Sequence, residues 1–313
     1  MTELDKKAQD LGVDLRVEIA GVELSNPIMP ASGTFSPWES SEFYDLNELG
    51  AAVTKGISAV PWDGNPLPRI AETYGGMLNS VGLENKGTDW YKAELLPYLS
   101  SFDTKIITNL AGHSVDEYVS AAEALSGRDE IDMFELNISC PNVSQGGIAF
   151  GTDPELAAKV TREVKKVIDK PLIVKLTPNV TDITVIAQAV EDAGADAVSL
   201  INTLFGMAID LKRRRPVLAN IKGGFSGPAV KPIALRMVWE TAKAVDVPVI
   251  GLGGITKGTD VVEFLAAGAS AVGIGTASLM DPTAMVRIKS ELIDYMHDNN
   301  FATISGLKEA FDF

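Results

Sequence analysis

The sequence predicts an α/β protein: one (β/α)8 (TIM) barrel over residues 1–313, with an N-terminal β-hairpin and long loops at its C-terminal face. Eight short apolar runs rich in Val and Ile alternate with amphipathic segments, a spacing typical of parallel strands covered by helices. The composition, 46% apolar and 22% charged, is that of a globular chain. Neither a GxGxxG nor a Walker A motif occurs, which disfavours the main alternative, an open doubly wound sheet.

The predicted elements begin with the hairpin at residues 15–23, whose alternating pattern suits a closure of the barrel bottom. Eight strands are predicted at residues 26–32, 51–56, 105–112, 133–139, 171–178, 197–203, 248–254 and 271–277. The clearest helices are predicted at residues 153–168, 182–193, 231–244, 260–267 and 282–296. No linker, charge block or repeat divides the chain, so we expect a single domain.

Two connections, residues 57–91 and 204–230, are too long for minimal barrel loops. Both follow the C-terminal ends of strands, where barrel enzymes build their active sites, so we expect lids or binding elements there. The second connection carries the basic run Lys212 to Arg215. Such a run is typical of a solvated loop face; attraction of a partner or substrate is the alternative.

The chain holds 42 acidic and 27 basic residues, a net charge of −15, which argues against nucleic-acid binding. An anionic substrate must therefore be attracted by local Lys, Arg or backbone N–H groups. The lone cysteine, Cys140, excludes an internal disulfide and a four-thiolate metal site, and no HExxH occurs, so we expect no metal. The N-terminus lacks a signal-peptide pattern, and glycines interrupt the uncharged stretch at 264–280, so we expect a cytoplasmic protein that does not span a membrane.

Polar residues recur where the predicted strands end. These are Lys55-Gly56, Asn109, Asn137, Lys175, Asn202-Thr203, Gly253-Gly254 and Gly275-Thr276. A single such residue is explained by a satisfied polar group in the core or by a lysine that extends to solvent. The repetition at one end of seven strands instead indicates a functional site, because an unpaired buried polar group costs about 1–3 kcal/mol.

The glycines at the seventh and eighth strands predict a phosphate site. Gly253-Gly254 and Gly275-Thr276 leave backbone N–H groups open, with predicted helix starts close behind. This corner of a barrel commonly binds phosphate, although glycine also simply permits tight turns. Ser226-Gly227 on the preceding long connection adds to the case for a phosphorylated ligand.

Cys140 lies just beyond the fourth predicted strand, between Asn137 and Asn142. A lone cysteine is often a small buried apolar residue. Its position at the active end favours a nucleophile or general base instead, once its surroundings stabilise the thiolate. The histidines, His113 and His297, are expected to be structural or solvated.

The sequence resembles a known family, the catalytic subunits of class 1B dihydroorotate dehydrogenase. The resemblance runs along nearly the whole chain and rests on long segments, among them NPIMPASGTF at 26–35, GMLNSVGLEN at 76–85, ELNISCPNVSQGGIAFGTDPE at 135–155, LINTLFGMAID at 200–210 and GGFSGPAVKPIALRMV at 223–238. The segment that follows CPNV looks like class 1B rather than class 1A. Tyr74, Lys86 and His113 depart from the family pattern, which has Pro at positions 74 and 86 and a small residue at 113.

The resemblance implies one FMN per chain and assigns site residues. The residues implied to surround FMN are Ser32, Lys55, Gly56, Asn109, Asn137, Lys175, Ile201, Gly227, Gly253, Gly254, Gly275 and Thr276. Those implied to hold dihydroorotate are Lys55, Asn79, Ser80, Val81, Gly82, Leu83, Asn137, Asn142, Asn202 and Thr203. Cys140 is implied to be the catalytic base, taking the C5 proton of dihydroorotate while the C6 hydride passes to N5 of FMN.

The resemblance also implies a partner, an electron-transfer subunit with FAD and a [2Fe–2S] cluster that reduces NAD⁺. A heterotetramer of two chains of each kind is the expected assembly. Alternatives remain open: a partner-independent class 1A-type enzyme that reduces fumarate, a flavin barrel acting on another pyrimidine, a non-redox phosphate-binding isomerase or lyase, and a silent scaffold. The intact set Lys55, Asn79, Asn137 and Cys140 argues against the scaffold.

Overall fold

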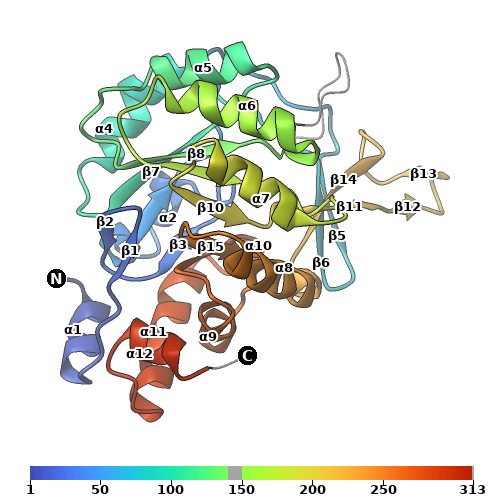
Figure 1. Ribbon diagram of the computed structural model, residues 1–313. Helices are drawn as coiled ribbons and strands as arrows, with labels where there is room; N and C mark the ends of the chain where they lie inside the picture. The colour runs from blue at the N-terminus through green and yellow to red at the C-terminus, as the bar shows by residue number, and fades with distance from the viewer. Residues whose placement is uncertain (140–149, 312–313) are drawn as a thin grey trace.

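The computed structural model describes residues 1–139 and 150–311, and its centre is a barrel of eight parallel strands (Figure 1). The barrel strands are β3 (Ile28–Pro30), β4 (Ala51–Val53), β7 (Lys105–Leu110), β8 (Met133–Asn137), β9 (Leu172–Lys175), β10 (Ala197–Leu200), β15 (Val249–Leu252) and β16 (Ala271–Ile274). Their order is β3-β16-β15-β10-β9-β8-β7-β4. The Gly50 N–H donates to the Ile28 carbonyl at 2.9 Å and so joins the two outer strands. The predicted (β/α)8 barrel is confirmed.

Helices surround the barrel, and the two at the ends of the chain, α1 and α12, pack against other helices. They are α1 (Glu3–Asp10), α2 (Pro37–Ser40), α3 (Gly87–Trp90), α4 (Leu96–Leu99), α5 (Val115–Glu123), α6 (Pro154–Lys165), α7 (Ile183–Asp192), α8 (Lys231–Ala244), α9 (Gly258–Ala266), α10 (Thr276–Met280), α11 (Ala284–Asp298) and α12 (Ile304–Glu309). In α6, Val160 and Val164 are fully buried, as the predicted spacing requires, and the Asp153 side chain caps the helix start. Among the described residues no helix is long and apolar enough to cross a membrane.

The N-terminal hairpin packs against the starts of the barrel strands. It consists of β1 (Val17–Ile19) and β2 (Val22–Leu24), paired antiparallel. Ile19 and Leu24 are fully buried in the same cluster as Met133, Ala197 and Ala271, each the first residue of its strand. The hairpin therefore closes the barrel bottom, as the sequence predicted, and leaves the opposite end for the site.

The two long connections form one sheet over that opposite end, where we had expected loops. Its strands are β5 (Ile70–Thr73), β6 (Gly76–Asn79), β11 (Leu204–Met207) and β14 (Lys222–Ser226), all antiparallel in the order β11-β14-β6-β5. The short strands β12 (Ile209–Asp210) and β13 (Arg215–Pro216) form a separate two-stranded sheet that projects away from the barrel (Figure 1). The basic run Lys212–Arg215 thus lies on a projecting arm.

The predicted strand runs all end later than the observed strands. The third run was predicted to end at Gly112, for example, whereas β7 ends at Leu110, and the sixth at Thr203, whereas β10 ends at Leu200. The polar and glycine residues just past each strand leave the sheet and turn toward the barrel mouth. The overshoot therefore covers part of the site, such as Gly56, Asn202 and Gly253, whereas Asn137 and Lys175 are the last residues of their strands.

Candidate active site

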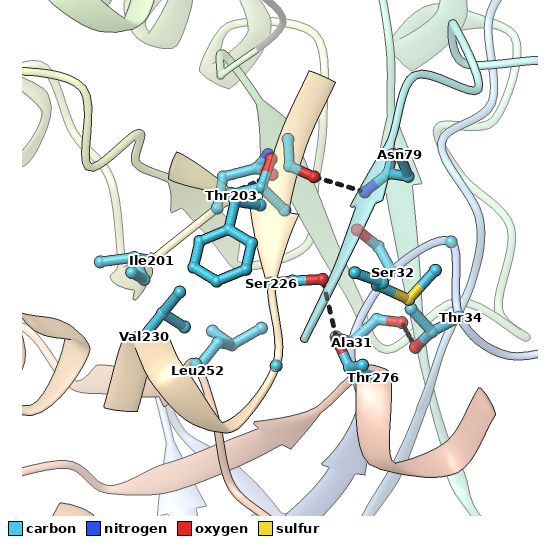
Figure 2. A pocket seen from close by; sticks show the side chains of 18 of the residues that line it. Ala31, Ser32, Thr34, Asn79, Ile201, Thr203, Ser226, Val230, Leu252 and Thr276 are labelled. Atoms are coloured by element: carbon cyan, nitrogen blue, oxygen red, sulfur yellow. Dashed lines mark hydrogen bonds between the residues drawn. The ribbon is translucent and has the colours of Figure 1, made fainter. Parts of the chain in front are cut away.

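A cavity of about 390 Å³ lies at the C-terminal ends of the barrel strands, beneath the sheet of the long connections. Every described residue of the two predicted ligand sets lines it, except Asn109. Figure 2 shows apolar Ile201, Val230 and Leu252 on one side of this cavity and Ser32, Thr34 and Thr276 on the other. An apolar wall facing hydroxyl groups suits a flat, polar-edged ligand.

The charged residues that line the cavity are all cationic. They are Lys55, Lys175 and Lys222, and among the described lining residues there is no Asp or Glu. The chain as a whole carries a net charge of −15, so the cavity opposes the sign of the molecule. Clustered cations in a concave site attract anions, which indicates a ligand with phosphate or carboxylate groups.

A buried polar layer lies under the cavity. The Lys175 side chain, 4% exposed, donates from Nζ to Ser32 Oγ at 2.9 Å and lies 3.7 Å from Glu135 Oε1. The Asn109 amide nitrogen donates to Glu135, and Ser199 Oγ donates to the other carboxylate oxygen at 2.8 Å. The layer is tied together by hydrogen bonds, so the Lys175 ammonium is held in place beneath the cavity.

Asn109 itself lies behind Gly56 rather than on the cavity surface. It is fully buried, and its Oδ1 has no hydrogen-bond partner among the described residues. A Cβ on Gly56 would lie 2.9 Å from this oxygen, so glycine is what leaves room in the wall there. A buried carbonyl without a donor costs about 1–3 kcal/mol, which a bound ligand can offset.

Amide side chains from several strands converge on the cavity. Asn202 Nδ2 donates to Asn137 Oδ1 at 3.3 Å, and Asn79 Nδ2 lies 3.5 Å from the Gly224 carbonyl (Figure 2). Asn179 donates to the Thr203 carbonyl at 3.0 Å and so anchors that segment. Each amide offers a donor and an acceptor, which suits a ring that carries both carbonyl and N–H groups.

The loop of residues 79–83 is braced from outside the cavity. Asn65 Nδ2 donates to the Ser80 carbonyl at 3.1 Å and to its hydroxyl at 3.0 Å. Arg69 forms an ion pair with Glu84 and donates to the Asp63 carbonyl at 2.7 Å. These contacts hold the loop against the cavity although Leu83 adopts a left-handed φ of 55°.

The predicted phosphate corner is rich in backbone that only glycine adopts readily. Gly227, Gly253 and Gly254 have φ of 115°, 129° and 74°. Gly275 differs, because a Cβ there would meet only Ala31 and Thr34 at 3.4 and 3.8 Å, which is ordinary contact. Thr276 and Ser226 share a hydrogen bond of 2.8 Å (Figure 2). The corner therefore presents hydroxyls and bare backbone.

Lys55 lies between this cavity and a second one of about 520 Å³, which Trp38, Trp62 and Trp90 also line. Burial lowers the pKa of the Lys55 ammonium below its usual value; Glu84 opposes this effect and Arg69 adds to it. Lys55 is thus a half-buried cation that gives up its proton more easily than a free lysine.

The remaining residues singled out in the sequence either lie outside the described residues or do not line the cavity. Cys140 and Asn142 lie outside the described residues. His113 stacks on Trp62 at 3.9 Å and lies 3.4 Å from Glu117, and His297 contacts the Leu11 carbonyl, so both lie away from the cavity. Within residues 1–139 and 150–311, no group of three metal-ligating side chains occurs.

Sequence reasoning did not single out Glu135 or Asn179. Glu135 is the middle residue of the apolar strand β8 and is 4% exposed. A charged residue at an inward strand position was the signal that could have found it, since such a residue requires partners. Asn179 lies beyond Lys175, which is the last residue of β9. Sequence reasoning considered the residues at the strand end itself, so it did not identify Asn179.

Comparisons with known proteins agree with this geometry. The sequence model of a family described as "Dihydroorotate dehydrogenase" matches residues 14–296. The chain is 56% identical over 298 residues to "Dihydroorotate dehydrogenase B (NAD(+)), catalytic subunit" of Alkaliphilus metalliredigens, covering 95% of this chain and 97% of that protein. It is 54% identical over 300 residues to the protein of the same name from Geobacter sulfurreducens, covering 96% and 98%. A crystal structure of DHODH from Eimeria tenella with ferulenol has the same fold, with a TM-score of 0.78 at 20% identity over 95% of this chain and 88% of that one.

Proposed function

Because the chain belongs to the dihydroorotate dehydrogenase family, we propose that it is the catalytic subunit of a class 1B enzyme, which oxidises (S)-dihydroorotate to orotate in pyrimidine biosynthesis. The observation that carries this is the cavity in which lysine is the only charged residue among the described lining residues, in a chain of net charge −15. Dihydroorotate is a carboxylate and FMN is a phosphate ester, so both need such a cavity. The names of the relatives support the same reaction.

The residues present fit FMN. Asn109 Oδ1, which lies beside the cavity wall, has no hydrogen-bond donor among residues 1–139 and 150–311. The open space at Gly275 and the hydroxyls of Thr276 and Ser226 suit a phosphate. We assign the phosphate end to Gly227, Gly253, Gly254, Gly275 and Thr276, and the ring to Ser32, Lys55, Gly56, Asn109, Asn137, Lys175 and Ile201. This makes residues 1–313 a single FMN-binding domain.

The substrate is held by amides and by Lys55. We assign it Asn79 to Leu83, Asn137, Asn202 and Thr203, with Asn142 from outside the described residues. The Asn137–Asn202 hydrogen bond fixes which amide atoms remain available to a ligand. Lys55 supplies a cation for the substrate carboxylate.

The proton and the hydride leave dihydroorotate by separate routes. We assign the C5 proton to Cys140, whose place in the sequence directly follows Ser139 on the cavity wall. The chemistry that FMN supplies when bound is acceptance of the C6 hydride. Lys175, held by Ser32 and Glu135, places positive charge beneath the cavity, where negative charge develops on reduction.

The electrons leave through a partner subunit, and a cytoplasmic location is part of this proposal. The chain has one cysteine and no dinucleotide fingerprint, so it cannot itself hold a four-thiolate [2Fe–2S] cluster and shows no NAD⁺ motif. We assign FAD and [2Fe–2S] to the partner, in a heterotetramer of two chains of each kind. The projecting arm and the adjoining end of β11 support contact between chains, because they expose Met207, Ile209 and Leu211 at 50%, 57% and 84%.

The test compares three electron acceptors with the isolated chain: NAD⁺, fumarate and an artificial dye. We expect dihydroorotate oxidation with the dye and hardly any with NAD⁺, and restoration of NAD⁺ reduction when the partner subunit is added. Strong NAD⁺ reduction without a partner would contradict the proposal. Strong fumarate reduction would place the protein in class 1A.

A further inference from the structure

Glu135 is a buried carboxylate that the proposed reaction does not use. It lies on β8, where it is in register with Asn109 on β7. Lys175 on β9 is in register with Asn137, two residues further along β8, and so lies next to Glu135. It is 4% exposed and does not line the cavity. Burying a carboxylate is costly, and stability alone is served as well by an apolar side chain of similar volume. The carboxylate therefore has another role.

The three polar groups recorded around Glu135 in the described part of the chain are all donors. The Asn109 amide nitrogen and the Ser199 hydroxyl donate to it, and the Lys175 ammonium lies 3.7 Å away. A carboxylate with such neighbours acts only as an acceptor. The Asn109 amide must therefore turn its nitrogen toward Glu135 and its oxygen away, beside Gly56 in the cavity wall.

Glu135 also moderates the charge of Lys175. Opposite charges less than 4 Å apart in a buried layer interact strongly. At 3.7 Å the pair is longer than a hydrogen bond, and the nearer partner of the ammonium is Ser32 Oγ at 2.9 Å. The positive charge of Lys175 under the cavity is thus partly offset by the Glu135 carboxylate, although the two groups do not form a hydrogen bond.

We propose that Glu135 is a positioning residue that fixes the acceptor oxygen of Asn109 and offsets part of the Lys175 charge, and that it thereby lowers the reduction potential of the bound flavin. The inference rests on the proposed function, since it requires FMN in this cavity. Reduction of the flavin adds negative charge above Lys175, and the negative charge of Glu135 beneath makes that addition less favourable.

The test is the midpoint potential of FMN in the full-length chain, measured by anaerobic spectroelectrochemistry. Glu135→Gln keeps the shape and removes the charge, and we expect its potential to rise by about 30 mV or more, a tenfold change in a two-electron equilibrium. Glu135→Asp retains the charge and should stay closer to the parent than Glu135→Gln does. Ser199→Ala removes a donor from the same carboxylate without changing charge, and it should change the equilibrium by less than about threefold.

A second pair of variants covers the case in which Glu135→Gln does not fold. Lys175→Gln should lower the potential, and adding Glu135→Gln to it should raise the potential again, because both buried charges then leave together. An unchanged potential in Glu135→Gln, or in the double variant relative to Lys175→Gln, overturns the inference. A parent chain that binds no FMN would instead overturn the proposed function, so the two failures are distinct.

Discussion

Gly275 is the residue at which the phosphate corner can be tested with least damage to the fold. Its φ is not left-handed, and an added Cβ meets neighbours at no less than 3.4 Å. We expect Gly275→Ala to fold normally and to bind FMN at least about tenfold more weakly, about 1.4 kcal/mol, because the methyl group occupies the approach to the backbone.

Isothermal titration of the apoprotein with FMN measures this effect. Gly306→Ala, at an exposed position of helix α12, is the matched control and should keep the parent affinity. Equal affinities for the two variants would remove Gly275 from the site. Gly254→Ala is a poorer test, since the φ of 74° strains any side chain there.

Lys55 predicts how ligand binding depends on pH. Burial lowers its pKa below the usual value near 10.5, so its positive charge is present at neutral pH and is lost as pH rises through that lowered pKa. Affinity for orotate should therefore fall at alkaline pH, by about tenfold or more once the ammonium is neutral. Spectral titration with orotate in a Cys140→Ser background measures this without ionisation of the thiol.

Lys55→Arg should keep its affinity over the same pH range, because a guanidinium does not lose its proton there. Lys222→Arg, at the exposed edge of the cavity, should follow the parent profile. A parent profile that is flat through alkaline pH would show that Lys55 does not bind the carboxylate.

At the scale of elements, helix α1 depends on a buried ion cluster at the barrel bottom. Lys289 on α11, 1% exposed, lies 2.7 Å from Glu48 and 2.9 Å from Asp5 of α1. Lys289→Met leaves Glu48 buried without its cation, and we expect the free energy of unfolding to fall by about 3–5 kcal/mol. Lys92→Met breaks a pair whose carboxylate is 97% exposed and should cost about 1 kcal/mol or less. Denaturant titration of both variants is the measurement.

The same cluster has a defined pH dependence. Burial raises the pKa of Asp5, but the Lys289 and Thr2 contacts outweigh it and hold that pKa below 3.8. Because the pKa of Asp5 is lower in the folded chain than in the unfolded chain, the Asp5 carboxylate stabilises the fold at pH values above about 3.8. This contribution is lost as the pH falls through the lower folded pKa. Lys289→Met should therefore show a weaker loss of stability below about pH 4 than the parent. An equal acid response in both would show that Lys289 does not set the Asp5 pKa.

The elements that the sequence predicted best are those whose pattern is local. Strands buried on both faces read as apolar runs, and α8 was predicted with its observed bounds, Lys231–Ala244. The sheet of the long connections was not predicted, because β6 pairs with β14, a partner about 145 residues away. Nothing in either segment alone specifies that pairing.

The residues of the candidate site also differ in how far a local sequence pattern could identify them. Residues at strand ends, such as Lys175 and Asn137, were found because polar groups interrupt apolar runs there. The role of Glu135 was missed because it depends on neighbours from three other strands: Asn109, Lys175 and Ser199. A charged residue inside an apolar strand indicates that Glu135 needs partners, but its position alone does not say which residues of the other strands those partners are.

At the scale of the whole molecule, the two ends of the barrel have different tasks. The bottom is closed by the hairpin and by α1 with its ion cluster, while the top carries cations, amides and glycines around one cavity. The site residues lie at the C-terminal ends of the barrel strands and in the sheet above them, away from the closed bottom. The cavity is positive although the molecule is negative, so its ligands are selected by local rather than net charge.

The most direct test of this account is an anaerobic titration of the purified, FMN-loaded chain with (S)-dihydroorotate, followed by visible absorbance. We expect the flavin band to bleach in the parent chain. In Cys140→Ser, which should bind FMN and orotate as the parent does, we expect bleaching about 10²–10⁴-fold slower near neutral pH, because the general base is lost. A chain that remains colourless after reconstitution with FMN, or a flavin that stays oxidised at saturating dihydroorotate, would contradict the account.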